Sequence, residues 1–291
     1  MAHNKQERWS KLVDAKLRQT LVTKDRTIFN NRYEGNPKAG KVKIPVRDTE
    51  VEVKAYNKST GVDLSEGSTS YIDLNIDQDE AVNELIDGYD AAAVPDNLVA
   101  DRLDSAGYSL ALSMDLKSIR LLEETSGVQV AAIRTEATES TAYKEALKAK
   151  TYLSRAGVPA TGRWMLASPE YLEVLMLDDH FIKQGDLSQQ LVAAGAVGKI
   201  AGFPVYECCN AMMDDTTLVS GKKTTTEFIC GHPDWCHRVM EWQEPVDIVS
   251  LKGSGKFIGA SAVQGRKVYG LLISKPKTVY VKRTETAVSG G

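Results

Sequence analysis

The sequence predicts an α+β fold in which strand-like segments lie on both sides of a helical middle. Three segments between residues 40 and 76 alternate apolar and polar residues, the pattern of half-buried strands. A helical pattern of unusual length follows at about 96–123, and further strand-like segments occupy residues 227–283. With 291 residues, the chain can bury a substantial core and form one large or two ordinary domains.

The first 31 residues are predicted to form an arm that depends on the rest of the molecule. They are polar, with scattered apolar residues, among which Trp9, Val13 and Leu17 have the spacing of a short amphipathic helix. The segment is too small to fold alone, so we expect it to lie on something larger.

Residues 40–76 are predicted to form a long antiparallel hairpin. Val42, Ile44 and Val46 share one face of the first segment, and EVEVKAY at 50–56 and SYIDLNI at 70–76 alternate similarly. The connecting stretch NKSTGVDLSEGSTS is polar and rich in turn-forming residues. A hairpin with so little apolar surface is marginal in isolation, so we expect either a flexible flap or support from another chain.

The long helical pattern is the strongest in the sequence. Its apolar residues recur at helical spacing: Val99, Leu103, Ala106, Leu110 and Met114, continuing to Leu121 and Leu122. Asp96 or Asn97 can cap its start, and Gly127 supplies a stop. Roughly 28 residues at 1.5 Å per residue give a rod of about 40 Å.

The middle of the chain is predicted to form a compact α/β unit. A helix is expected at about 141–156 with a buried stripe of four residues: Ala142, Ala146, Ala149 and Leu153. The strand RWMLAS follows, and Ser168 caps a short helix with Pro169 at its first position. Another strand is expected at 198–206, and EFICG, VDIVSLK, KVYGLLI and TVYVKR are strand-like.

Bulk composition excludes several classes of protein. The net charge is −3, so composition does not predict a nucleic-acid-binding surface, which needs a concentrated basic face. No apolar run approaches the roughly 20 residues that span a membrane, and the polar N-terminus lacks the apolar core of a secretory signal. Four cysteines in a chain of this length do not suggest a disulfide framework, so we expect synthesis in a reducing cytoplasm.

Two glycine-rich stretches suggest phosphate binding but lack the required pattern. Gly195 and Gly198-Lys199 do not form Gly-x4-Gly-Lys-Ser/Thr, and a strand follows where a phosphate loop needs a helix. GSGKFIG at 253–259 lacks the dinucleotide-binding spacing. We interpret the first stretch as a turn into a strand and the second as a loop.

One set of side chains could bind a metal: Cys208, Cys209, Cys230, His232, Cys236 and His237. Nitrogen and sulfur donors could hold tetrahedral zinc, and Cys236-His237 could form a reactive pair. However, the spacing matches no familiar zinc knuckle, and adjacent strand residues point to opposite faces. We therefore expect buried structural cysteines, with no metal and no cofactor. The acidic runs 178–180 and 214–215 are expected in solvated turns.

Several stretches in combination resemble the major capsid proteins of tailed bacteriophages, which have the Hong Kong 97-type fold. SYIDLNIDQDEAVNELID resembles the strand that returns the family's extended loop to the body, and LALSMDLKSIRLL, with its Asp115, the end of its spine helix. GRWMLASPEYLEVLML resembles the strand-Ser-Pro-helix unit of the axial domain, and GAVGKIAGFPVYECCNAM the Gly-x-Ile-x-Gly-Phe-x-Val-Tyr strand that follows. GRKVYGLLISKPKTVYVKR resembles the closing strand pair of the peripheral domain. Together they span about residues 40–283.

The resemblance implies a division of the chain and a structural, non-enzymatic role. The division is an N-terminal arm at 1–31, an extended loop at 32–76, a peripheral domain at 77–130 and 245–283, an axial domain at 131–244 and a tail at 284–291. The implied role is self-assembly into pentamers and hexamers of an icosahedral phage head around double-stranded DNA, with assembly in the bacterial host cytoplasm. A flap and an arm that cannot fold alone both agree with this, because neighbouring subunits would support them.

The partners implied are other copies of the chain, a portal and, in some members, a decoration protein. Because the arm starts almost at Met1, we expect a separate scaffolding protein or none. Packaged DNA would be contacted weakly and without sequence specificity, and no membrane is involved. Assembly contacts are expected at five residues: Trp9, Phe29, Lys54, Tyr56 and Lys58. In some relatives a loop lysine bonds covalently to a neighbour's asparagine, but intersubunit salt bridges are the simpler expectation here.

Two other functions remain open from the sequence. An encapsulin-like nanocompartment shell shares the fold but encloses a cargo enzyme in place of DNA. A metal-dependent enzyme would use the Cys/His cluster at 230–237.

Overall fold

The computed structural model describes residues 16–24, 27–33, 40–46, 50–67, 69–89, 98–131, 138, 141–183, 195–209, 215–219 and 222–286. The strands are β1 (Lys41–Val46), β2 (Ser70–Asn75), β3 (Gln78–Ile86), β4 (Gln129–Val130), β5 (Trp164–Ala167), β6 (Ile182–Lys183), β7 (Gly198–Ile200), β8 (Phe203–Glu207), β9 (Asp215–Val219), β10 (Lys222–Gly231), β11 (Cys236–Ser250), β12 (Ser261–Ile273) and β13 (Tyr280–Thr286). The helices are α2 (Leu98–Glu124), α3 (Ala142–Arg155) and α4 (Pro169–Leu177), with 3-10 turns η2 (Pro233–Trp235) and η3 (Pro276–Thr278).

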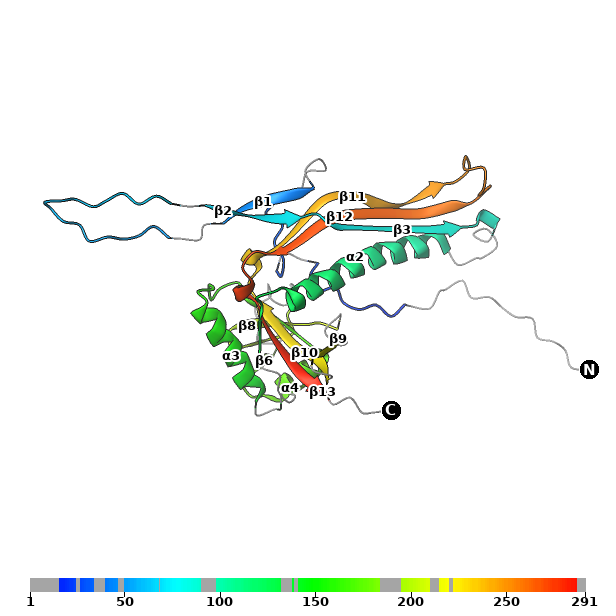
Figure 1. Ribbon diagram of the computed structural model, residues 1–291. Helices are drawn as coiled ribbons and strands as arrows, with labels where there is room; N and C mark the ends of the chain where they lie inside the picture. The colour runs from blue at the N-terminus through cyan, green and yellow to red at the C-terminus, as the bar shows by residue number, and fades with distance from the viewer. Residues whose placement is uncertain are drawn as a thin grey trace, which may run out of the picture.

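The elements form two bodies (Figure 1). The first, which we name the spine body, consists of α2 lying against a sheet of strand order β11-β12-β3. The second, the compact body, holds a larger sheet in which the described strands run β4-β13-β10-β5-β8-β7-β6, with β9 pairing with β10. Strands β1 and β2 form a separate two-stranded ribbon that projects from the spine body (Figure 1).

Helix α2 is the long helix that the sequence predicts. Its 27 residues at 1.5 Å each make a rod of about 40 Å. Ala106 and Leu110 are 4% and 3% exposed, and Ala106 packs with Ile86 and Val263 of the sheet. Near its end, Ile119 and Leu122 are fully buried in a second cluster shared with the compact body. The helix therefore connects the two cores along its length.

The compact body packs α3 and α4 against one face of its sheet. The predicted stripe Ala142, Ala146, Ala149 and Leu153 is fully buried. The side chain of Ser168 accepts a hydrogen bond from the Tyr171 backbone N–H, and Pro169 occupies the first turn of α4, so the predicted cap is confirmed.

Residues 198–206 correct one sequence expectation. They form a hairpin of two antiparallel strands, β7 and β8, where the sequence suggested one strand. Ile200 pairs with Phe203, so Ala201 and Gly202 are the whole turn, and both have positive φ (48° and 93°). Positive φ at both central residues is the geometry of the tight hairpin turn that matches strand twist.

Strand β13 corrects another expectation. The family resemblance implies that TVYVKR and KVYGLLI form the closing strand pair of one domain, but β13 pairs with β10 and β4 in the compact body, while β12 pairs with β11 and β3 in the spine body. The chain turns between them at η3, which carries it from one sheet to the other. The alternating pattern predicted each strand but carried no information on its neighbours.

Among the described residues, no helix is both long enough and apolar enough to cross a lipid bilayer.

Candidate assembly surface

The projecting ribbon is anchored at its base. Strands β1 and β2 pair in register from Lys41↔Asn75 to Val46↔Ser70. Ile44, Val46 and Leu74 are buried with Val239 of β11. At Gly270, an added Cβ would lie 2.4 Å from the Asn75 carbonyl oxygen, so only glycine lets β2 cross the sheet this closely. The base of the loop thus belongs to the spine body's core.

Beyond the base, the loop has no core of its own. Every residue from 50 to 67 is exposed. The predicted second strand at 50–56 is wrong, because these residues form no strand and have no pairing partner among the described residues. The tip is a tight turn in which the Gly61 N–H donates to the Asn57 carbonyl oxygen at 2.8 Å. The turn is closed by residues within the loop, and the two extended stretches that lead to it pair with no strand in the described part of the chain.

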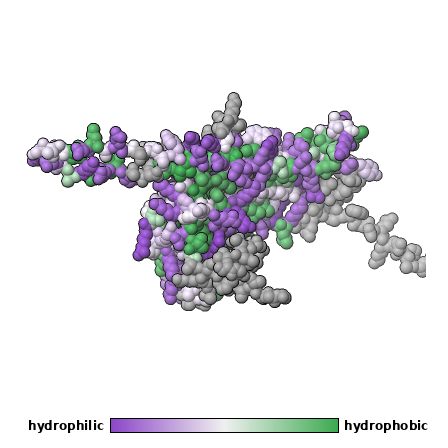
Figure 2. All heavy atoms as spheres, in the orientation of Figure 1, coloured by the Kyte–Doolittle hydropathy of each residue, from purple (hydrophilic) through white to green (hydrophobic). Residues whose placement is uncertain are grey.

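Apolar side chains on this stretch are solvent-exposed to an unusual degree (Figure 2). They are Val51, Val53, Tyr56, Val62 and Leu64, with exposures from 44% for Val62 to 100% for Leu64. Burying one such side chain fully stabilises a complex by about 1.5–3 kcal/mol. A concentration of exposed apolar residues on one segment marks an interaction site. The loop therefore has the chemistry of a contact that this subunit alone does not make.

The five predicted assembly residues have different outcomes. Lys54, Tyr56 and Lys58 lie exposed on the loop, and Lys54 forms an ion pair with Glu52 at 3.5 Å. Trp9 lies outside the described residues. Phe29 is 1% exposed and packs in the subunit's own core, so the expectation of an intersubunit contact is corrected by its burial.

Val62 and Leu64 were not among the contact residues predicted from the sequence. The signal was available, because both are apolar residues in a stretch otherwise rich in Gly, Ser, Thr and charge. A cross-strand row on the sheet face that α2 does not cover was also not predicted from the sequence. There Asp79 accepts two hydrogen bonds from the Arg266 guanidinium, at 2.7 and 2.5 Å, and Arg266 lies over the Trp242 ring.

The Cys/His residues do not form a metal site. The fully buried Cys230 and Cys236 belong to separate core clusters. His232 bonds to the Thr161 carbonyl oxygen at 2.9 Å, while His237 lies between Asn30 and Ser274. Burial raises the pKa of the Cys236 thiol to about 12 and that of Cys230 further, so neither is a ready thiolate. Within the described ranges, no three His, Cys, Asp or Glu side chains are grouped as metal ligands.

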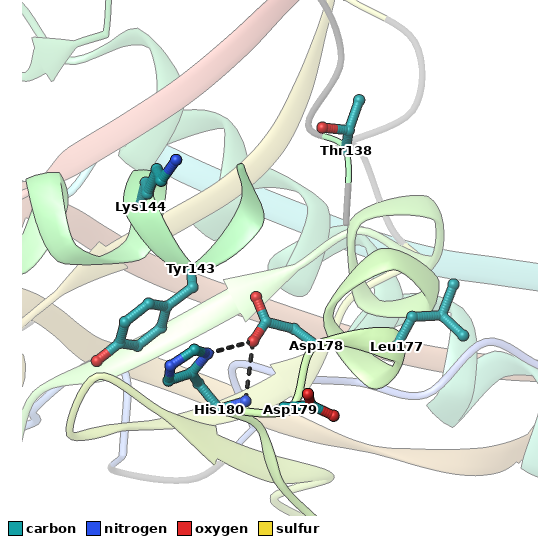
Figure 3. Close-up of a pocket in the computed structure, with 7 residues that line it drawn as sticks. All are labelled: Thr138, Tyr143, Lys144, Leu177, Asp178, Asp179 and His180. Atoms are coloured by element: carbon teal, nitrogen blue, oxygen red, sulfur yellow. Dashed lines mark hydrogen bonds and ion pairs between the residues drawn. The ribbon is translucent and has the colours of Figure 1, made fainter. Parts of the chain in front are cut away.

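The acidic run 178–180 borders a cavity of about 540 Å³ between the start of α3 and the end of α4 (Figure 3). His180 stacks on Tyr143 with ring centroids 4.2 Å apart, and its Nδ1 lies 2.8 Å from Asp178 Oδ1. Burial alone would raise the pKa of Asp178, but hydrogen bonds from the His180 backbone and side chain outweigh it and lower that pKa.

The glycine-rich stretches are structural. Gly198 opens β7, and a Cβ there would lie 2.0 Å from the Phe181 ring, so this glycine permits close packing. Residues 253–259 are exposed and join β11 to β12. Neither stretch leads into a helix whose N-terminus could bind phosphate.

No protein-family model matches the sequence, and no curated protein matches it either. Solved structures match over nearly the whole chain. A structure from Mycobacterium phage Che8 is similar with a TM-score of 0.73 at 21% identity, over 97% of this chain and 98% of that chain. The capsid structure of cyanophage P-SCSP1u gives a TM-score of 0.74 at 13% identity, over 96% and 92%. The asymmetric unit of the bacteriophage PhiM1 mature capsid gives 0.68 at 14%, over 97% and 92%. The chain therefore has the Hong Kong 97-type α+β fold.

Proposed function

We propose that this chain is the major capsid protein of a tailed bacteriophage, a non-enzymatic subunit that assembles into a closed shell. The observation that carries the proposal is the extended loop, whose residues 50–67 are all exposed while its base is built into the core. A loop that is anchored in the core at its base and exposes apolar side chains beyond it is suited to pack against a neighbouring subunit. Similarity to phage capsid structures over 96–97% of the chain supports the same role.

The finer features of the proposal follow the sequence analysis. The shell would consist of pentamers and hexamers with icosahedral symmetry, assembled in the host cytoplasm around double-stranded DNA that it contacts weakly. A scaffolding protein, a portal and a decoration protein are its proposed partners. We retain the division into arm, extended loop, peripheral domain, axial domain and tail. The spine and compact bodies support its outline, but β13 pairs with the compact body.

Negative-stain electron microscopy of the purified chain, expressed alone and with its neighbouring genes, tests the proposal. We expect closed shells or capsomer rings in at least one sample. A matched variant that lacks residues 57–67 should purify as a folded subunit that forms no closed shells. Closed shells of normal size from this variant would contradict the proposed role of the loop.

An encapsulin-like nanocompartment is less favoured, because the similar structures reported above come from phages, two of them named as capsids. The contents of the purified shell separate the two functions: nuclease-protected DNA supports the capsid, and a co-purifying cargo protein supports the compartment. The metal-dependent enzyme is disfavoured by the separation of Cys230 from Cys236. Stoichiometric zinc in an elemental analysis of the purified protein would support the metal-dependent enzyme.

A further inference from the structure

The described part of the N-terminal arm has two sections with different attachments. Residues 16–23 run along α2: Lys16 pairs with Asp101 at 2.6 Å, and Arg18 pairs with Asp104 at 2.5 Å. Over this section the arm advances seven residues while its partners on α2 advance fourteen, from 101 to 115. Seven extended residues and fourteen helical residues both span about 20 Å, so the arm is an extended strap parallel to the helix.

The outer end of the strap is held only at the surface. Both ion pairs are solvent-exposed, and Leu17 between them is fully exposed. Exposed pairs of this kind contribute little and are screened by salt. The inner end is held more firmly, because the backbone N–H and hydroxyl of Thr23 both donate to buried Asp115, at 2.7 and 2.6 Å. Detachment of the strap is therefore expected to proceed from its outer end inward.

Residues 28–30 are inserted where the two bodies meet. Ile28 and Phe29 are each 1% exposed and share a cluster with Ile119 of α2 and with Trp164 and Leu166 of β5. This cluster contains side chains from both bodies, so these two arm residues fill the space between the spine helix and the larger sheet.

Asn30 is bonded to the start of β11 and to η2, the turn that leads into β11. Its backbone N–H donates to the Cys236 carbonyl oxygen at 2.8 Å, and its carbonyl oxygen accepts from the Arg238 N–H at 2.9 Å, so it pairs with the start of β11. Its side chain donates to the Pro233 carbonyl oxygen in η2 and lies 3.0 Å from Nδ1 of His237. Nε2 of His237 in turn contacts the Ser274 hydroxyl at 3.0 Å.

These contacts lie close to the places where the backbone passes from one body to the other, which we call the crossings. In the described part of the chain after α2, the backbone passes between the bodies at 125–128, through η2 and through η3. Val128 packs against the cluster of Ile28 and Phe29, Asn30 bonds to η2, and His237 connects Asn30 to Ser274 beside η3. One short arm segment thus bonds to η2 directly, shares a cluster with the crossing at 125–128 and reaches the crossing at η3 through His237.

We propose that residues 28–32 are a clamp that fixes the angle between the spine and compact bodies, and that residues 16–23 are the strap through which the clamp is released. A pull on the strap from the N-terminal side would be transmitted to Asn30 after Thr23 leaves Asp115. The bodies would then be free to change their relative angle about the three crossings. The inference concerns the isolated subunit and does not depend on the proposed capsid function.

The test uses the full chain with paired spin labels. Cysteines replace exposed Ala81 on β3 and exposed Glu173 on α4, in a Cys209→Ser background because Cys209 is partly exposed. Pulsed electron–electron double resonance then gives the distribution of distances between the two spin labels, one on each body. Asn30→Ala removes the side-chain bonds to η2 and His237, and Asn31→Ala, at the exposed neighbouring position, is the matched control.

We expect Asn30→Ala to broaden or shift the distance distribution, while Asn31→Ala leaves it unchanged. The Arg238 N–H donates to the backbone carbonyl oxygen of Asn30, which the substitution keeps. Because the loss of its side-chain bonds loosens residue 30, this hydrogen bond should weaken, and amide exchange at Arg238 should accelerate roughly tenfold in Asn30→Ala. Should Asn30→Ala not fold, Arg32→Ala, which removes the exposed ion pair with Asp234, should give a smaller shift in the same direction. An unchanged distribution in a variant whose Arg238 amide has lost protection would overturn the clamp, as would equal broadening in the Asn31 control.

Discussion

The extended loop offers the sharpest prediction, because its contribution to folding and its contribution to assembly separate cleanly. Val62 and Leu64 are 44% and 100% exposed and lie in a stretch where every residue is exposed. Neither side chain is buried in the subunit, so replacing both by Ser removes little packing. The free energy of unfolding should therefore change by less than about 0.5 kcal/mol, the range typical of surface substitutions.

Assembly should respond very differently. If both side chains are buried against a neighbour, each stabilises the contact by about 1.5–3 kcal/mol, so the double variant loses about 3–6 kcal/mol per contact. At about 1.4 kcal/mol per tenfold, that corresponds to roughly a hundredfold to ten-thousandfold weaker association at each contact. The predicted phenotype is a normally folded subunit that does not form shells at concentrations where the parent does.

Sedimentation velocity over a range of subunit concentrations measures this directly, with thermal unfolding as the test of folding. Asp63→Ser, between the two apolar positions, is the matched control and should assemble like the parent. If the double variant assembled at the parent's threshold concentration, the loop's apolar side chains would not be the contact, and the reasoning from exposure would be refuted.

Three further predictions concern the fold. Leu110→Asp should prevent folding, because Leu110 is 3% exposed and packs closely against Gly265 of β12, so the substitution would bury a carboxylate at this contact. Soluble, assembled variant protein would show that the wrong face of α2 has been assigned. Burial, aided by repulsion from Arg32, lowers the pKa of His237 from 6.5 to about 4, so between these values the unfolded chain binds a proton that the folded chain does not. Its contribution to stability is complete above about pH 6.5 and falls, by about 3 kcal/mol, as the pH drops to 4. Denaturant titrations of parent and His237→Gln should show a flatter profile for the variant over this window, and parallel profiles would contradict the assignment. Ala201→Gly should raise stability by up to about 1 kcal/mol, because Ala201 has a φ of 48°; a lowered melting temperature would argue against strain at this turn.

Local sequence patterns predicted the elements whose determinants are local. The buried stripe of α3 and the cap of α4 by Ser168 were predicted by helical spacing and capping chemistry. The length of α2 followed from one uninterrupted apolar pattern. These features depend on residues within a few positions of one another, which is why a single sequence contains them.

The errors came from contacts between distant residues. Alternation predicted a strand at 50–56, but a strand also needs a partner, and none of the described residues pairs with it. Alternation likewise could not place β13 in a different sheet from β12. Phe29 was expected as an assembly contact, and only the cluster that it shares with residues of α2 and β5 shows that it fills the junction between them. The loop was predicted as a contact because its lack of core is visible in its composition.

The most direct test of the central claim is a cryo-electron microscopy reconstruction of the particles formed by the purified chain, alone or with its neighbouring genes. The account predicts a closed shell in which residues 50–67 lie against an adjacent subunit and Val62 and Leu64 are buried there. A closed shell whose loops project into solvent, or the absence of shells from every sample, would contradict it.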